Sequence, residues 1–207
     1  MDKQAREARE QMKQLNKKDK WVNFWYYYRT HVIVAIIAVL LIVFTAVECA
    51  KRIDYDLNIS YYSATPISEE RVNKLTEGLK TKVEDINFNG QTDVYIASCF
   101  ANPEQMSEQT KAVMMKLSAE LAAGDSMGYI LDQVYCDMIE KSYGECFESI
   151  IKISDIPEIK EMLGIPDGQS VYWATKLVYE SEKDKEEKIL SHENALKVEE
   201  YFKSLQK

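Results

Sequence analysis

The sequence predicts an N-terminal helix with one transmembrane span, followed by a single small α/β domain with a mostly parallel four-stranded sheet. Three observations support this prediction. An apolar run, residues 32–47, contains no charged residue, glycine or proline. The chain before this run is basic, whereas the chain after it is acidic. From residue 54 onwards, short segments with the pattern of strands alternate with segments of helical periodicity.

Residues 32–47 are expected to cross a membrane as a helix. At about 1.5 Å per residue the run covers roughly 24 Å, slightly less than the ~30 Å hydrocarbon core of a bilayer. Aromatic residues and an arginine precede the run, as is typical of the headgroup layer: Trp21, Trp25, Tyr26, Tyr27, Tyr28 and Arg29. This cluster argues against a buried helix of a soluble protein. Glu48 and Cys49 occupy the place of a signal-peptide cleavage site, so an uncleaved signal anchor is expected.

The distribution of charge predicts the orientation of the chain. Residues 1–31 contain eight Lys or Arg and four acidic residues, a net charge of +4. The whole chain carries −8, which leaves −12 for residues 32–207. The positive-inside rule then predicts a cytoplasmic basic helix and aromatic segment in residues 1–31, a transmembrane helix in residues 32–50 and an extracytoplasmic domain in residues 54–207. The acidic balance excludes nucleic acid as an expected partner.

Four segments have the pattern of strands. They are residues 54–62, 92–100, 129–131 and 171–179. The second is apolar on both faces, as buried parallel strands are, whereas the first alternates strictly between polar and apolar residues. Because this alternation is unusual in a parallel sheet, we expect one face of the first strand to be thinly covered.

Helical segments lie between and after these strands, where apolar residues are spaced three or four apart. They are residues 69–86, a helix begun by Asn102 and Pro103 and ended by Gly124, a helix capped by Asp132 and ended by Gly144, residues 154–164, and a last helix after Ser191. The charged run Glu180–Lys188 is interpreted as an exposed loop or a solvated helix turn. Strands that alternate with helices imply parallel pairing with right-handed crossovers.

The sequence contains little that indicates catalysis. It has no Gly-x-Ser-x-Gly, phosphate-loop or His-Glu-x-x-His motif, and paired acids such as Glu199 and Glu200 are expected on solvent-exposed helix faces. Cys99, Cys136 and Cys146 lack metal-site spacing; they are either small buried side chains, or Cys136 and Cys146 form a disulfide. We therefore expect a non-catalytic protein without cofactor or metal.

A small ligand of an open α/β sheet binds at the carboxyl ends of the strands. Polar and aromatic residues at or near the predicted sheet edge form a candidate ligand-binding set: Tyr62, Ser63, Asn102, Asp132, Gln133 and Tyr172. The alternative to a ligand site is that Asn102 and Asp132 are only helix caps and that the aromatic residues belong only to the core.

Several stretches share a pattern with a known family. Residues 114–125 form a helix rich in Lys, Leu and Ala that ends in Ala-Gly, and Tyr-Ile-Leu-Asp follows at 129–132. Residues 143–147 and 168–174 continue with a helix end and a strand. Together these stretches resemble the first lobe of extracellular solute-binding proteins. The resemblance covers roughly residues 54–180 and implies half of a periplasmic-binding-protein-like fold.

The anchor and the resemblance together imply a role at the cell surface. The chain has room for one lobe, and one lobe provides only half a cleft. We expect a non-catalytic, membrane-anchored extracytoplasmic binding or interaction module of a bacterial cell, with the lipid bilayer and a protein or surface polymer as partners. The alternative is a membrane-tethered receptor for a small solute that works with a transporter or a second lobe. A cell-envelope enzyme is the least favoured class.

Overall fold

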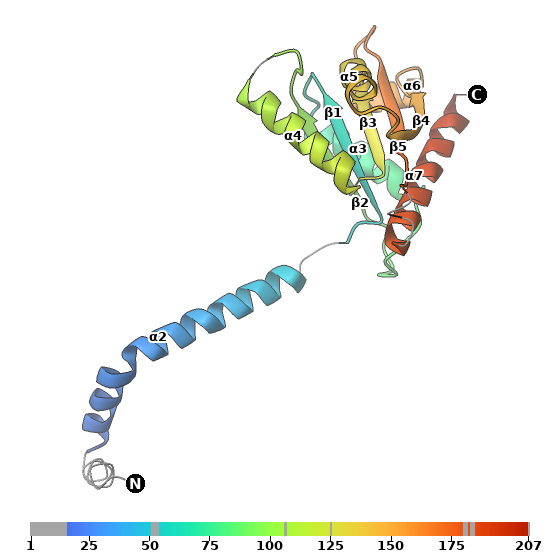
Figure 1. Cartoon of the computed structure of the whole chain (residues 1–207). Helices are drawn as coiled ribbons and strands as arrows, with labels where there is room; N and C mark the ends of the chain where they lie inside the picture. Colours follow the sequence, from blue (N-terminus) through green and yellow to red (C-terminus); the bar gives the residue numbers. More distant parts are fainter. Residues whose placement is uncertain are drawn as a thin grey trace. The chain divides into compact units, whose positions relative to one another are not determined.

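The computed structural model describes residues 16–50, 54–105, 107–124, 126–179, 182 and 185–206. The chain divides into two compact units, Met1–Ile53 and Asp54–Lys207. The first unit contains helix α2, Lys17–Ala50 (Figure 1). Most of the predicted basic N-terminal helix lies outside the described residues.

Helix α2 joins the aromatic segment to the apolar run without a break. Its stretch Phe24–Thr45 has a mean hydropathy of 2.1 and is long and apolar enough to span a membrane, a property it shares with signal sequences. None of this stretch is buried within the protein. The predicted single apolar helix near the N-terminus is therefore confirmed.

The second unit is an α/β domain built on a five-stranded mixed sheet (Figure 1). The strands are β1 (Leu57–Ser63), β2 (Val94–Phe100), β3 (Gly128–Asp132), β4 (Phe147–Lys152) and β5 (Val171–Lys176), in the order β2-β1-β3-β5-β4. Strand β1 pairs in parallel with β2 and β3, whereas β5 is antiparallel to both of its neighbours. The α/β class is confirmed, but the sheet has five strands instead of four and is mixed instead of mostly parallel.

The additional strand, β4, has a sequence without a clear strand signature. It lies at one edge of the sheet and is half-buried along most of its length, so Phe-Glu-Ser-Ile-Ile-Lys is neither strictly alternating nor continuously apolar. The register with β5 also shifts between Phe147 and Ser149, as at a β-bulge. Periodicity therefore gave no reason to predict a strand here.

Helices cover both faces of the sheet. They are α3 (Glu69–Lys80), α4 (Glu108–Ala123), α5 (Gln133–Tyr143), α6 (Pro157–Leu163) and α7 (Glu186–Leu205). Gly124 and Gly164 end α4 and α6 in the left-handed conformation, with φ of 68° and 61°, and the end at Gly124 is as predicted. Helix α7 begins at Glu186 instead of after Ser191, within the run that was expected to be an exposed loop or a solvated helix turn.

Two further helix bounds correct the predictions. Helix α3 ends at Lys80 instead of residue 86, although Val83 beyond it is still buried. Helix α4 begins after Ser107, whose hydroxyl accepts a hydrogen bond from the N–H of Thr110. Asn102 therefore does not cap α4; its side chain accepts the Glu104 N–H in a separate turn.

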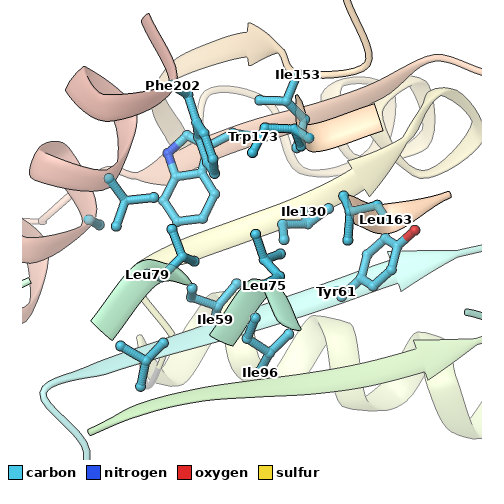
Figure 2. Packing of buried hydrophobic residues seen from close by; sticks show 14 of the residues in the cluster. Ile59, Tyr61, Leu75, Leu79, Ile96, Ile130, Ile153, Leu163, Trp173 and Phe202 are labelled. Atoms are coloured by element: carbon cyan, nitrogen blue, oxygen red, sulfur yellow. The ribbon is translucent and has the colours of Figure 1, made fainter. Parts of the chain in front are cut away.

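The two faces of the sheet carry separate hydrophobic clusters. The cluster under α3, α6 and α7 contains ten residues labelled in Figure 2: Ile59, Tyr61, Leu75, Leu79, Ile96, Ile130, Ile153, Leu163, Trp173 and Phe202. The cluster under α4 and α5 includes Leu117, Leu121 and Ile139. The apolar positions of β1 thus face the first cluster, as the alternation predicted.

Two polar residues of the predicted first strand are fully buried, Asp56 directly before β1 and Ser60 within it, whereas Asn58 is half-buried. The Asp56 carboxylate is fully buried and accepts hydrogen bonds from the N–H groups of Ile86 (2.9 Å), Asn87 (3.3 Å) and Asp93 (2.7 Å). Ser60, also fully buried, donates to the Glu120 carboxylate under α4 at 2.8 Å. The expected thin cover is wrong because buried polar partners replace the apolar residues of an ordinary parallel strand.

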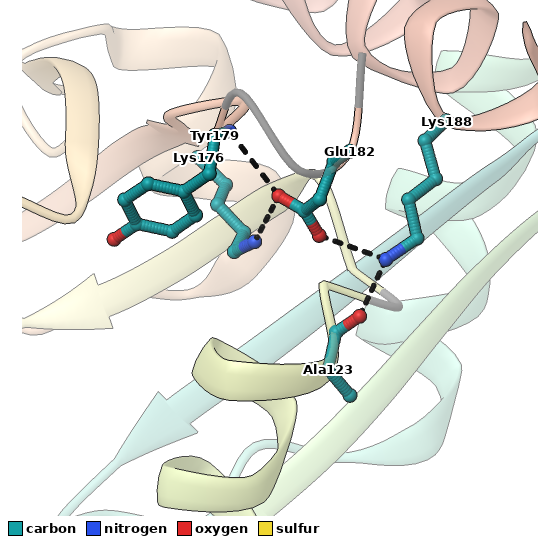
Figure 3. Close-up of polar contacts among 5 residues, drawn as sticks. All are labelled: Ala123, Lys176, Tyr179, Glu182 and Lys188. Carbon is teal, nitrogen blue, oxygen red and sulfur yellow. Dashed lines mark hydrogen bonds and ion pairs between the residues drawn. The ribbon is translucent and has the colours of Figure 1, made fainter. Parts of the chain in front are cut away.

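The charged run Glu180–Lys188 contributes to a buried ionic cluster. Glu182 is 7% exposed and accepts hydrogen bonds from Lys176 (3.3 Å), Lys188 (2.8 Å) and the Tyr179 N–H (3.3 Å) (Figure 3). Lys188 also donates to the Ala123 carbonyl at the end of α4. The cluster therefore joins β5, α4 and α7, and the expectation of an exposed loop or a solvated helix turn is wrong at Glu182. Residues 180, 181, 183 and 184 lie outside the described residues.

Two other expectations are corrected by burial. Glu199 is 3% exposed and accepts hydrogen bonds from the hydroxyls of Thr175 (2.6 Å) and Ser149, so it does not lie on a solvent-exposed helix face. Its pKa is lowered: burial would raise it, but the hydrogen bonds from Lys203, Ser149 and Thr175 outweigh burial. Cys99, Cys136 and Cys146 are free, buried thiols, so the Cys136–Cys146 disulfide is not formed.

Candidate functional site

The strand order creates a topological switch point between β1 and β3. The chain leaves β1 for β2 on one side and later forms β3 on the other side, so the two crossovers diverge at the carboxyl ends of β1 and β3. Open α/β sheets bind ligands at such points. The structure brings Ser63 and Asp132 together there, because the Ser63 hydroxyl donates to Asp132 Oδ2 at 3.1 Å.

The Asp132 carboxylate is used by the protein itself. Besides Ser63, its Oδ2 accepts the Ala64 N–H at 2.6 Å, and its Oδ1 accepts the Tyr135 N–H at 3.0 Å as the N-cap of α5. The Tyr135 hydroxyl donates to the Ala101 carbonyl at 2.8 Å, which joins the end of β2 to this network. Asp132 is 3% exposed. The switch point is therefore closed by hydrogen bonds between the strand ends, and Asp132 acts as a helix cap.

Two predicted site residues lie beside this network and are more accessible. Strand β5 runs antiparallel to β3, so Tyr172, near the start of β5, lies opposite Leu131, near the carboxyl end of β3. The Tyr172 hydroxyl donates to Gln133 Oε1 at 2.5 Å, and Gln133 donates to Asp137 at 2.6 Å. The half-buried Tyr172 and the exposed Gln133 thus form a polar pair next to Asp132.

The other two predicted residues face elsewhere. Tyr62 is fully buried and its hydroxyl donates to Glu120 at 2.7 Å, so it offers no stacking surface at the strand ends. Burial raises the pKa of Tyr62, and the hydrogen bond to Glu120 raises it further. Lys116 lies 3.5 Å from Glu120 and 3.2 Å from Cys99 Sγ. Tyr62, Glu120 and Lys116 thus form a polar cluster between β1 and α4. Asn102 lies outside this cluster, in its own turn.

The predicted membrane-interface residues all lie on α2. Trp21, Trp25, Tyr26, Tyr27, Tyr28 and Arg29 occupy consecutive turns. The five aromatic residues are exposed, from 46% for Trp25 to 80% for Tyr26, and Arg29 is exposed as well. Their expected location at the headgroup depth of a membrane stays a prediction.

A groove lies beside β2, where the sequence did not indicate one. It has a volume of about 440 Å³ and lies between β2 and α3. The lining includes Ile67 and Val72 and the four residues of β2 that face α3: Val94, Ile96, Ser98 and Phe100. We call this feature the β2 groove. The sequence predicted a strand at residues 92–100 that is apolar on both faces, but it did not predict the position of β2 at the edge of the sheet.

No protein-family model, curated protein or solved structure matches the chain. The candidate sites are therefore defined by their own geometry. The switch point is a closed polar network with an accessible Gln133–Tyr172 pair beside it, and the β2 groove is an open, partly apolar surface along a sheet edge.

Proposed function

We propose that this chain is a single-pass membrane protein whose α/β domain lies outside the membrane and acts as a non-catalytic interaction module. Support for the anchor comes from the length and apolar character of α2 and from the exposed aromatic residues at its start. Support for the orientation comes from charge, since residues 1–31 carry +4 and residues 54–207 carry −13.

One observation carries the proposed interaction role. The switch point, where this class of sheet holds small ligands, is filled by hydrogen bonds among Ser63, Ala64, Asp132 and Tyr135. The β2 groove, in contrast, is an open, partly apolar surface that follows β2 from Val94 to Phe100. An open groove along a strand suits a macromolecular partner better than a small solute, which needs to be enclosed on most sides.

The proposal includes the resemblance to one lobe of extracellular solute-binding proteins. Helices on both faces of the sheet and the parallel order β2-β1-β3 are compatible with such a lobe. The antiparallel β5 and the additional β4 were not part of the expected sheet. A domain held near a membrane by a short connection would then present its groove to partners at the cell surface.

Protease accessibility tests the orientation. The chain carries a different epitope tag at each end, and intact cells are treated with protease. We expect loss of the C-terminal tag in intact cells and loss of the N-terminal tag only after lysis, with a cytoplasmic protein as a control for integrity. A C-terminal tag that survives until lysis would reverse the orientation.

The accessible Gln133–Tyr172 pair favours a second candidate function, a membrane-tethered receptor for a small solute. A thermal-shift screen of sugars, amino acids and short peptides on the full chain in detergent tests it. A solute that raises the melting temperature by several degrees, and fails to do so in Tyr172→Phe, supports the receptor. The matched control is Tyr143→Phe, which changes an exposed tyrosine at the last residue of α5, whereas Gln133 is the first residue of that helix.

A further inference from the structure

Strand β2 presents unpaired backbone groups at the edge of the sheet. The Asp93 carbonyl accepts the Asp56 N–H at 2.8 Å, and the Ala101 N–H donates to the Ser63 carbonyl at 3.2 Å. Odd-numbered residues of β2 therefore point their backbone groups toward β1, and the even-numbered residues point theirs away from the sheet. The outward set is Val94, Ile96, Ser98 and Phe100. Within the described part of the chain, only the Phe100 carbonyl of this set has a protein partner, the Gln109 amide at 2.9 Å.

The two edges of the sheet are protected to different degrees. Strand β4, at one edge, has a bulge, contains Glu148 and Lys152, and has its Lys152 carbonyl covered by the Gln206 amide at 2.8 Å. Such features prevent unwanted strand pairing. Strand β2, Val-Tyr-Ile-Ala-Ser-Cys-Phe, has no charge and no proline, and its register with β1 is unbroken. The β2 edge is therefore the one that is ready to pair with another strand.

The β2 groove lies where the side chains of an added strand would fall. The four outward-facing residues of β2 all line the groove, because backbone direction and side-chain face alternate together in a strand; Tyr95 also contributes to the lining. A strand added to this edge would place every second side chain over the apolar wall formed by Ile67, Val72 and Ile96. Backbone pairing would then supply affinity and the groove would supply selectivity.

The negative charge of the domain indicates which class of partner binds the β2 groove. Residues 54–207 contain 16 Lys or Arg and 29 Asp or Glu, and the one charged side chain among the described residues that line the groove is Glu69. Two copies of so acidic a domain repel one another, whereas a basic partner is attracted. We propose that β2 and the β2 groove bind an extended basic segment of another polypeptide as an added strand. This inference rests on the proposed interaction function and names its partner class.

Peptide binding to the full chain in detergent micelles tests the proposal. The probe is a fluorescent peptide in which valine alternates with threonine between terminal lysines, and binding is followed by anisotropy. We expect saturable binding and slower amide hydrogen exchange at Ile96 and Ser98. A peptide with alternate N-methylated amides should not bind, and one with glutamate in place of lysine should bind at least about tenfold more weakly.

Two variants separate edge pairing from general attraction. Ser98→Pro removes an outward N–H without removing a hydrogen bond to β1, and should abolish binding while circular dichroism stays unchanged. Glu69→Lys should weaken the binding of the lysine peptide about tenfold and strengthen the binding of the glutamate peptide. Glu70→Lys is the matched control: it makes the same charge change one residue away, outside the lining of the β2 groove, and should alter binding less than about threefold.

Four results would overturn the inference. Three of them are absence of binding by the folded chain, equal effects of Glu69→Lys and Glu70→Lys, and normal binding by Ser98→Pro. A concentration-dependent dimer with slow exchange at Ile96 in the absence of peptide would assign the edge to a second copy and would also overturn it. The protease experiment is independent of these outcomes, so failure here is distinguishable from failure of the proposed location.

Discussion

The buried cluster around Glu182 should make a large contribution to the stability of the domain. Lys176 is fully buried and Lys188 is 16% exposed at its side chain, and both donate to the one carboxylate. Glu182→Gln removes the negative charge and leaves two lysines facing a neutral amide. Removing one partner of a buried ion pair costs about 3–5 kcal/mol. We expect the lower end, about 3 kcal/mol, because Lys176 keeps the Tyr179 ring at 5.1 Å and Lys188 keeps the Ala123 carbonyl.

Urea unfolding of the full chain in mild detergent measures this cost. In a Trp21→Phe, Trp25→Phe background, Trp173 is the remaining tryptophan and reports on the core of the domain. With a denaturant slope of about 2 kcal/mol per M, Glu182→Gln should lower the urea midpoint by about 1.5 M. Glu77→Gln, which breaks an exposed pair with Lys80, should change stability by less than about 1 kcal/mol.

A double variant tests the physical reason as well as the size of the effect. Lys176→Met with Glu182→Leu replaces the buried pair by apolar side chains and should recover at least half of the lost stability. The proposed role of the ion pair is refuted if the free energy of unfolding of Glu182→Gln lies within about 1 kcal/mol of the parent value, or if the double variant is less stable than Glu182→Gln.

Three other predictions concern the same domain. Gly124→Ala should destabilise it more than Gly90→Ala in the same urea assay: both positions have positive φ, but a new Cβ at Gly124 would meet Glu182 and lie 2.8 Å from both lysine Nζ atoms, whereas at Gly90 it meets nothing within 4 Å. Hydrogen bonds lower the pKa of Glu182 and of Glu199 in the folded state despite burial, so stability should be full above their ordinary pKa of 4.5 and should fall as the pH drops below it. A Glu182→Gln, Glu199→Gln variant should show a shallower decline of the urea midpoint between about pH 5 and pH 3, and an equal decline would contradict the assignment. Burial raises the pKa of the Cys136 thiol to about 11, so iodoacetamide should modify this thiol only after unfolding. Because the thiol is free, reductant should not change the electrophoretic mobility of the chain. Rapid labelling of Cys136 in the folded chain would contradict its burial.

Local patterns predicted those features that depend on neighbours in the chain. The apolar face of β1, the cap at Asp132 and the left-handed glycine at 124 are all as expected. Each depends on residues within a few positions, because strand alternation, helix capping and positive φ are local properties. The α/β class followed from the same patterns.

Contacts between distant segments decided the rest. The buried state of Glu182 depends on Lys176, and that of Glu199 on Ser149 and Thr175. A surface carboxylate and a buried one have the same sequence pattern until their partners are known. The direction of β5 likewise depends on pairing with β3 and β4. Because β5 is antiparallel to β3, Tyr172 lies at the end of the strands where Asp132 is located.

The candidate sites divide along the same line. The residues at the switch point could be named from the sequence, because strand ends and caps are local, but only the folded chain brought Ser63 and Ala64 onto Asp132 and closed the position. The β2 groove required the strand order, which no single segment encodes. Composition and periodicity determined that the chain has an apolar helix and an α/β domain, and long-range pairing determined which edge of that domain is open, because hydrogen bonds between strands join residues far apart in the chain.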